Sequence, residues 1–111
     1  MLHQGGETVD AQELYRQILE VHPDHFDSLH MLGVSAVQTG EMEYGIALIE
    51  KGITVNPDIA AVYNNLGNSQ KKLLQYDNAI VSYEKALSIR PDYADAHNNL
   101  GNTYLQLGRL S

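Results

Sequence analysis

A repeat of 34 residues constrains the fold of this chain more than any other feature. The pentapeptide NNLGN fills residues 64–68 and recurs at residues 98–102, and MLGV at residues 31–34 is a weaker copy one interval earlier. A Pro-Asp pair keeps the same interval and begins at Pro23, Pro57 and Pro91. A fixed period of this length is typical of stacked units, each too small to bury a core alone. We therefore expect an array of similar units and not a fold around one centre.

Each unit predicts a pair of helices, because apolar residues recur at helical spacing between glycine and proline signals. We expect helices over residues 10–21, 26–38, 42–55, 60–73, 76–89 and 94–107. Turns are expected at Thr39-Gly40 and Leu74-Gln75, inside the two complete units. Gly5-Gly6 is interpreted as a turn that follows the end of an earlier helix over residues 1–4. The N-caps expected from residue type are Asp10, Asp24 and Asp58.

Three glycines recur in the middle of predicted helices, at Gly33, Gly67 and Gly101. A glycine there costs about 1 kcal/mol relative to alanine. Its regular recurrence indicates that a neighbouring helix approaches too closely for a side chain. The small residues expected on the opposite helix are Gly45 and Gly52 in one unit, and Ala79 and Ala86 in the other.

The composition supports a folded chain and argues against several classes of protein. With 43% hydrophobic and 19% charged residues, the chain is too apolar to remain disordered. The formal net charge of −7 argues against nucleic acid as the main partner, because a phosphate backbone requires a basic surface. The absence of cysteine excludes disulfides and thiolate metal sites.

The sequence predicts neither membrane insertion nor secretion. No apolar run approaches the roughly 18 residues that a membrane span needs. The first residues lack the basic region and apolar segment of a signal peptide. A cytoplasmic location is therefore the default expectation.

The second complete unit carries the residues that point to a family. They are Tyr63, Leu66, Gly67, Ala79, Tyr83, Ala86 and Pro91, and the last unit begins the pattern again with His97, Leu100, Gly101 and Tyr104. This arrangement resembles the tetratricopeptide repeat (TPR) family, and is similar to the repeats of O-linked N-acetylglucosamine transferases and related bacterial TPR proteins. The departures from the pattern are Gln70, where the family has a tyrosine, and Leu29, Ala36, Gly45, Ile49 and Gly52 in the first complete unit.

The resemblance implies an all-α fold, an α-solenoid of antiparallel helix pairs in a right-handed superhelix, with about six helices. Residues 26–59 and 60–93 would each form one repeat. Residues 1–25 would supply only the second helix of a repeat, over about residues 10–21. Residues 94–111 would supply only a first helix, so the array is expected to be truncated.

Members of this family bind extended peptides in a concave groove that is lined by the first helix of each pair. If this chain is similar, the groove carries side chains from three successive first helices. They are His30, Val34, Asn64, Asn65, Asn68, Lys71, Lys72, Asn98, Asn99, Asn102 and Leu105.

The six asparagines of that set need an explanation, because asparagine is a mediocre helix former. One hypothesis is an amide ladder, whose donors and acceptors bind a peptide backbone whatever its sequence. The alternative is that some of these amides brace neighbouring helices. A clamp on the C-terminal carboxylate of a partner is a second mode in the family, but only Lys71 and Lys72 bring positive charge to the predicted groove.

No group of residues predicts catalysis, a metal site or a cofactor. His22, His25 and His30 are close in sequence but flank a turn, which favours solvated or capping roles. His97 stands in an aromatic position of the repeat and is expected to be packed. No nucleophile–histidine–acid arrangement, phosphate-binding loop or pair of catalytic carboxylates stands out. We therefore predict no enzyme activity.

The function predicted from these observations is a non-catalytic protein–protein interaction module that binds a peptide or a partner protein in its groove. One alternative is a substrate-recruiting segment of a larger enzyme, such as a glycosyltransferase. A second alternative is self-assembly, in which exposed terminal helices stack end to end or swap between copies to form a homo-oligomer.

Overall fold

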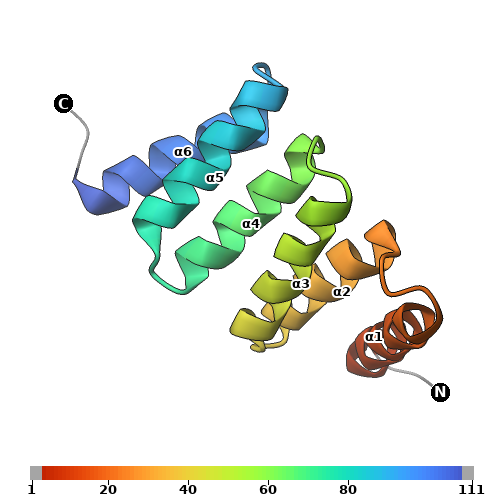
Figure 1. The fold of residues 1–111 in the computed structure, drawn as a ribbon. Helices are drawn as coiled ribbons and strands as arrows, with labels where there is room; N and C mark the ends of the chain where they lie inside the picture. The colour runs from red at the N-terminus through yellow and green to blue at the C-terminus, as the bar shows by residue number, and fades with distance from the viewer. Residues whose placement is uncertain (1–3, 109–111) are drawn as a thin grey trace. The chain divides into compact units, whose positions relative to one another are not determined.

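The structure is a computed structural model that describes residues 4–108, and these residues form six α-helices and no strand. In chain order, as labelled in Figure 1, the helices are α1 (Gln4–Val21), α2 (Phe26–Gln38), α3 (Met42–Val55), α4 (Ala60–Lys72), α5 (Tyr76–Ile89) and α6 (Ala94–Leu107). The prediction of an all-α fold with about six helices is confirmed.

The helices belong to two compact units, Met1–Pro57 with α1 to α3 and Asp58–Ser111 with α4 to α6. In the first unit, α2 and α3 form an antiparallel hairpin and α1 packs on α2 (Figure 1). In the second, α4 and α5 form the hairpin, and α6 packs mainly on α5 while it also contacts α4. Within each unit, helices that follow one another in sequence thus pack together, as expected for helical hairpins.

Four helices begin and end at the predicted residues, namely α2, α3, α5 and α6. Helix α4 ends at Lys72, one residue before its predicted end. The prediction for the N-terminal segment was wrong, because α1 begins at Gln4 and continues through Gly5, Gly6 and Asp10. Each glycine weakens a helix by about 1 kcal/mol, but packing of the later turns on a neighbour outweighs that local preference. Most of the earlier helical end predicted over residues 1–4 lies outside the described residues.

Two other predicted caps were also wrong. The N-cap of α2 is His25 and not Asp24, and the backbone N–H of Ser28 donates to its Nδ1 at 3.2 Å. The N-cap of α4 is Ile59 and not Asp58, and it makes no side-chain cap hydrogen bond. At the N-termini of both α2 and α4, the residue directly before the helix is the N-cap because its backbone is extended. The ψ angle is 104° at His25 and 107° at Ile59.

The mid-helix glycines mark close helix contacts in both hairpins. A Cβ atom on Gly33 would lie 2.8 Å from the carbonyl oxygen of Gly45 and 2.7 Å from Ile49 Cγ1. In the second hairpin, a Cβ atom on Gly67 would lie 2.5 Å from the ring of Tyr83. Ile49 and Tyr83 are both 0% exposed, so these side chains cannot move aside freely. The close approach predicted from the repeat is therefore present in α2–α3 and α4–α5.

Gly101 has no such neighbour, since a Cβ atom added there would meet nothing within 4 Å. It occupies the same place in NNLGN as Gly67, but α6 is the last helix that the structure describes. The same pentapeptide therefore packs closely against a neighbouring helix at Gly67 but not at Gly101.

This difference gives a stability test. We expect Gly67→Ala to destabilise the chain by about 1–3 kcal/mol, because the methyl group would overlap the buried Tyr83 ring. We expect Gly101→Ala to stabilise it by up to about 1 kcal/mol, through helix propensity alone. Urea unfolding of both variants measures the effects, and equal changes at the two sites would show that the repeated glycine has no packing role.

The turns inside the two hairpins differ in residue type but not in backbone shape. Gly40 has φ 95°, in the left-handed region that glycine adopts without strain. Leu74, at the corresponding place of the second hairpin, has φ 61° and a side chain that is 70% exposed. A leucine in this conformation costs roughly 1–2 kcal/mol.

Replacing Leu74 by glycine is therefore expected to stabilise the chain. Relief of the left-handed strain exceeds the entropy that glycine adds to the unfolded state, and leaves a gain of about 0.5–1 kcal/mol. Thermal or urea unfolding measures it. Leu74→Ala is the control, because it removes the exposed apolar side chain but keeps the strain, and a gain as large as that of Leu74→Gly would contradict the explanation.

Candidate functional site

The predicted groove residues lie on the first helix of each pair, α2 in the first unit and α4 and α6 in the second. His30 and Val34 are both half-buried on α2. The ring of His30 lies 6.1 Å from that of Phe26, centroid to centroid. Burial lowers the pKa of His30, and the nearby Asp27 carboxylate partly opposes that shift. The surroundings of His30 therefore disfavour the protonated form of its ring.

An amide pair joins α4 to α6 in the second unit. The side chain of Asn99 donates from Nδ2 to Oδ1 of Asn64 at 3.0 Å. Asn64 is only 5% exposed, so most of its surface is already covered by this unit. Because these residues are 35 positions apart, the bond fixes one first helix against the next. This pair fits the bracing alternative.

A second amide connects α4 to α5. Tyr83 donates its hydroxyl to Oδ1 of Asn68 at 2.6 Å. Burial raises the pKa of Tyr83 to about 12, and a hydrogen bond with Thr103 partly opposes that rise. The phenol therefore remains a donor at any physiological pH, which keeps Asn68 oriented.

The remaining predicted residues are exposed or half-buried. Asn98 and Asn102 are exposed on α6, and Leu105 on the same helix is 60% exposed. Their spacing of four and three residues places them along one face of the helix. Asn65 is half-buried, with its backbone carbonyl accepting from the Ser69 hydroxyl at 2.9 Å. Lys72 is exposed and Lys71 half-buried in the last turn of α4.

Gln70, which stands where the family has a tyrosine, is 8% exposed. It accepts a hydrogen bond at Oε1 from the Ser82 hydroxyl at 2.6 Å. A buried polar contact thus connects α4 and α5 in place of an aromatic ring. This substitution is structural and adds nothing to the exposed face.

The histidines do not converge on a metal site. Within the described part of the chain, no cluster of three or more histidines and carboxylates could hold a metal ion. His25 caps α2, in line with the capping role predicted for it. The packed position predicted for His97 was wrong, since its ring is exposed and donates from Nε2 to the carbonyl of Pro91 at 2.8 Å. No helix among the described residues is both long enough and apolar enough to span a membrane.

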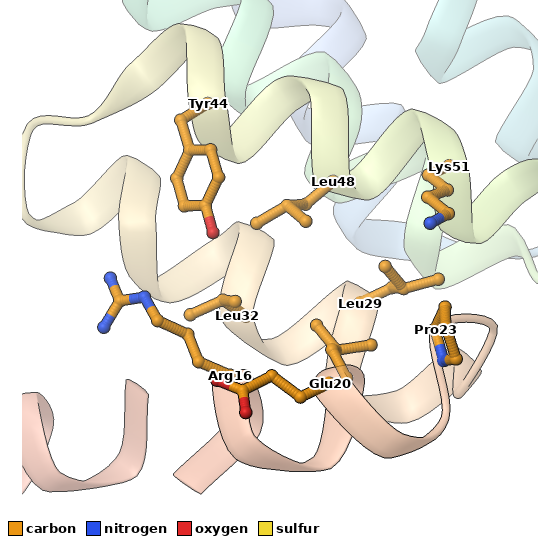
Figure 2. Close-up of a pocket in the computed structure, with 9 residues that line it drawn as sticks. Arg16, Glu20, Pro23, Leu29, Leu32, Tyr44, Leu48 and Lys51 are labelled. Atoms are coloured by element: carbon orange, nitrogen blue, oxygen red, sulfur yellow. The ribbon is translucent and has the colours of Figure 1, made fainter. Parts of the chain in front are cut away.

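The structure also contains a pocket that was not predicted from the sequence. It lies in the first unit, where α1 and α3 both pack beside α2, and it has a volume of about 290 Å³. Figure 2 shows its lining, with Arg16 and Glu20 on α1, Leu29 and Leu32 on α2, and Tyr44, Leu48 and Lys51 on α3. One signal in the sequence could have found it, because Arg16 and Lys51 are the only lysine or arginine residues before Pro57.

Comparison with known proteins agrees with this architecture. A family model described as tetratricopeptide repeat matches residues 4–58, and one described as TPR repeat matches residues 75–108. No curated protein sequence matches the chain.

Solved structures of two kinds of protein are similar. A crystal structure of MamA has a TM-score of 0.86 at 23% identity, and the match covers 98% of this chain and 67% of that one. A MamA structure designated AMB-1 has a TM-score of 0.79 at 31% identity, covering 88% and 58%. An O-GlcNAc transferase mutant from Thermobaculum terrenum has a TM-score of 0.84 at 28% identity, covering 89% of this chain but 19% of its own. The chain thus spans between a fifth and two thirds of these relatives.

Paired helices, a 34-residue period and small residues at the helix contacts define an α-solenoid repeat protein. With two family models matched over most of its length, the chain belongs to the tetratricopeptide repeat family. Its repeats support a role as a protein-interaction scaffold.

The bracing role of Asn99 can be tested against its neighbour. Asn99→Ala leaves the buried Asn64 amide without its donor, and we expect a loss of about 1–2 kcal/mol in unfolding free energy. Asn98→Ala makes the same chemical change on an exposed position of the same helix, and should leave stability within about 0.5 kcal/mol. Urea denaturation compares them. Equal stability of the two variants would mean that the amide pair does not brace the helices.

Proposed function

We propose that this chain is a non-catalytic interaction module that binds an extended peptide or a partner segment along the exposed face of its first helices. The proposal rests on one observation in the second unit, namely that some of its asparagines are bonded within the unit while others are exposed to solvent. Asn64 and Asn99 bond to each other, whereas Asn98 and Asn102 present amides to solvent from a helix that this bond holds in place. Fixed helices with free amides are what a peptide-binding surface requires.

The chemistry of that surface favours the backbone of the ligand. Each exposed amide offers both a donor and an acceptor, which can pair with one peptide group. Leu105, 60% exposed along the same face, offers an apolar contact for a side chain. Lys71 and Lys72 in the last turn of α4 bring positive charge that suits an acidic side chain or a C-terminal carboxylate. His30 and Val34 lie on α2 of the first unit, and the proposal rests on the second unit alone.

Two other roles remain alternatives to this proposal. The similarity to part of an O-GlcNAc transferase supports a substrate-recruiting segment of a larger enzyme, with the peptide surface serving a catalytic domain. Self-assembly is supported only by exposed apolar side chains such as Leu74 and Leu105. The peptide-binding proposal is common to the first two roles, and we propose no catalytic residue or cofactor in this chain.

Peptide selection tests the proposal. The chain is immobilised, peptides are selected from a random-sequence display library, and dissociation constants are measured by fluorescence anisotropy. We expect the double variant Asn98→Ala, Asn102→Ala to bind about tenfold more weakly, because two hydrogen bonds of about 0.5–1.5 kcal/mol each are lost. Asn78→Ala is the control, as an exposed asparagine on the second helix α5.

Circular dichroism verifies that each variant remains folded. Equal weakening by the double variant and by Asn78→Ala would place the ligand elsewhere. Concentration-dependent association in sedimentation experiments, without selection of any peptide, would favour self-assembly instead.

A further inference from the structure

The pocket between α1 and α3 lies apart from the predicted groove residues, none of which lines it. Its base is formed by Leu29 and Leu32 of α2, each 1% exposed, and its sides by Leu19 and Leu48. α1 and α3 both pack beside α2, and the pocket forms a trough lined by all three helices. Tyr44, 44% exposed, extends into this trough from α3 in Figure 2. The apolar lining would accept an apolar side chain of a ligand.

The charges around the pocket are unlike those of the rest of its unit. Residues 1–57 carry nine aspartates and glutamates but only two basic residues, and both of these, Arg16 and Lys51, line the pocket. They come from opposite walls, Arg16 from α1 and Lys51 from α3, and lie toward opposite ends in Figure 2. The acidic surface elsewhere repels anions, so the unit presents one place at which a negative group is attracted.

Both cations are available to a ligand. Across residues 11–108 the structure shows one salt bridge, between Arg90 and Asp92 in the other unit. The hydrogen bond that Arg16 makes is a long one, 3.4 Å from Nη2 to the neutral amide oxygen of Gln12. Lys51 is exposed. Glu20 is the one carboxylate in the lining, and it forms no salt bridge with either cation.

We propose that this pocket binds a short acidic segment of a partner protein, in which an apolar side chain is flanked by carboxylates on both sides. The apolar side chain enters the trough over Leu29 and Leu32. One flanking carboxylate pairs with Arg16 and the other with Lys51. This surface is separate from the amide face of the first helices and goes beyond the function proposed for it.

The arrangement of the two cations favours a peptide over other anions. Arg16 and Lys51 come from different helices and lie toward opposite ends of the pocket in Figure 2, which favours a ligand with two separate negative groups over a single anion. Nucleic acid would meet the nine carboxylates of the same unit. A peptide can place one carboxylate on each side of an apolar residue. This order matches the pocket, in which the apolar trough lies between Arg16 and Lys51. The volume of about 290 Å³ suits one or two large side chains.

The binding test uses the whole 111-residue chain and a fluorescein-labelled peptide of sequence EELFEE with blocked ends. Fluorescence anisotropy at low salt gives its dissociation constant. QQLFQQ removes the charges of the peptide and EESSEE removes its apolar residues, and both are expected to bind at least about fivefold more weakly. Affinity for EELFEE should fall as salt is raised, because exposed ion pairs are screened.

Variants of the lining separate this site from the rest of the surface. Arg16→Gln and Lys51→Gln should each weaken EELFEE binding about two- to fivefold, and together about tenfold. Glu20→Gln should strengthen it by about twofold, since it removes the only carboxylate in the pocket. Lys85→Gln, an exposed lysine on α5, removes the same charge elsewhere and should have no effect. All four positions are at the surface or half-buried, and circular dichroism verifies folding.

Three results would overturn the proposal. One is equal affinity for EELFEE and QQLFQQ. Another is loss of EELFEE binding in the Asn98→Ala, Asn102→Ala variant with no effect of Arg16→Gln or Lys51→Gln, which would place the peptide on the amide face. The third is binding of decanoate without binding of the peptide, which would assign the pocket to a fatty acid. Failure of this site leaves the amide face untouched, because the two tests share no residue.

Discussion

The contact at the mid-helix glycines is the interaction on which both hairpins depend. At Gly33 the backbone of α2 approaches that of α3 so closely that a methyl group would lie 2.8 Å from the Gly45 carbonyl. Helix backbones at this distance leave no room for slippage, so the side chains next to the glycine are fixed as well. Ile49 and Tyr83 fill the remaining space and are fully buried as a result. The direction in which the exposed residues of α2 and α4 point follows from this contact, whereas Gly101 of α6 makes no contact of this kind.

Periodicity predicted the helices well because each boundary in the repeat has its own local signal. Helix α2 ends just before the turn at Gly40, α3 and α5 each end two residues before a proline, and α6 ends at the residue before Gly108. Predictions failed where one local signal competed with another. Gly5-Gly6 was interpreted as a turn, yet the helix runs through it. Asp24 and His25 can both act as an N-cap. The extended backbone of His25 makes it the N-cap of α2, and that conformation could not be predicted from the sequence.

The candidate site was predictable in residue type but not in role. The two copies of NNLGN are identical, yet Asn64 is buried and bonded while Asn98 is exposed, and Asn68 accepts from Tyr83 while Asn102 is exposed. The difference is tertiary, since α4 has α5 on one side and α6 on another, whereas Asn98 and Asn102 face no further helix of the described chain. No local pattern could separate the amides that brace the unit from those that remain available to a ligand.

The distribution of charge gives the two units different chemistry. Residues 58–111 carry five acidic and five basic residues, so the whole net charge of −7 belongs to residues 1–57. On the proposed peptide surface of the neutral unit, the exposed amides of Asn98 and Asn102 would select ligands by backbone hydrogen bonds, and would therefore be tolerant of sequence. The proposed pocket, with a pair of cations within an acidic unit, would select by charge pattern, because the acidic residues of the unit repel an anion that does not pair with both cations. A scaffold with both surfaces would bind one ligand through its peptide backbone and another through its negative charges. Neither surface requires the other to be occupied.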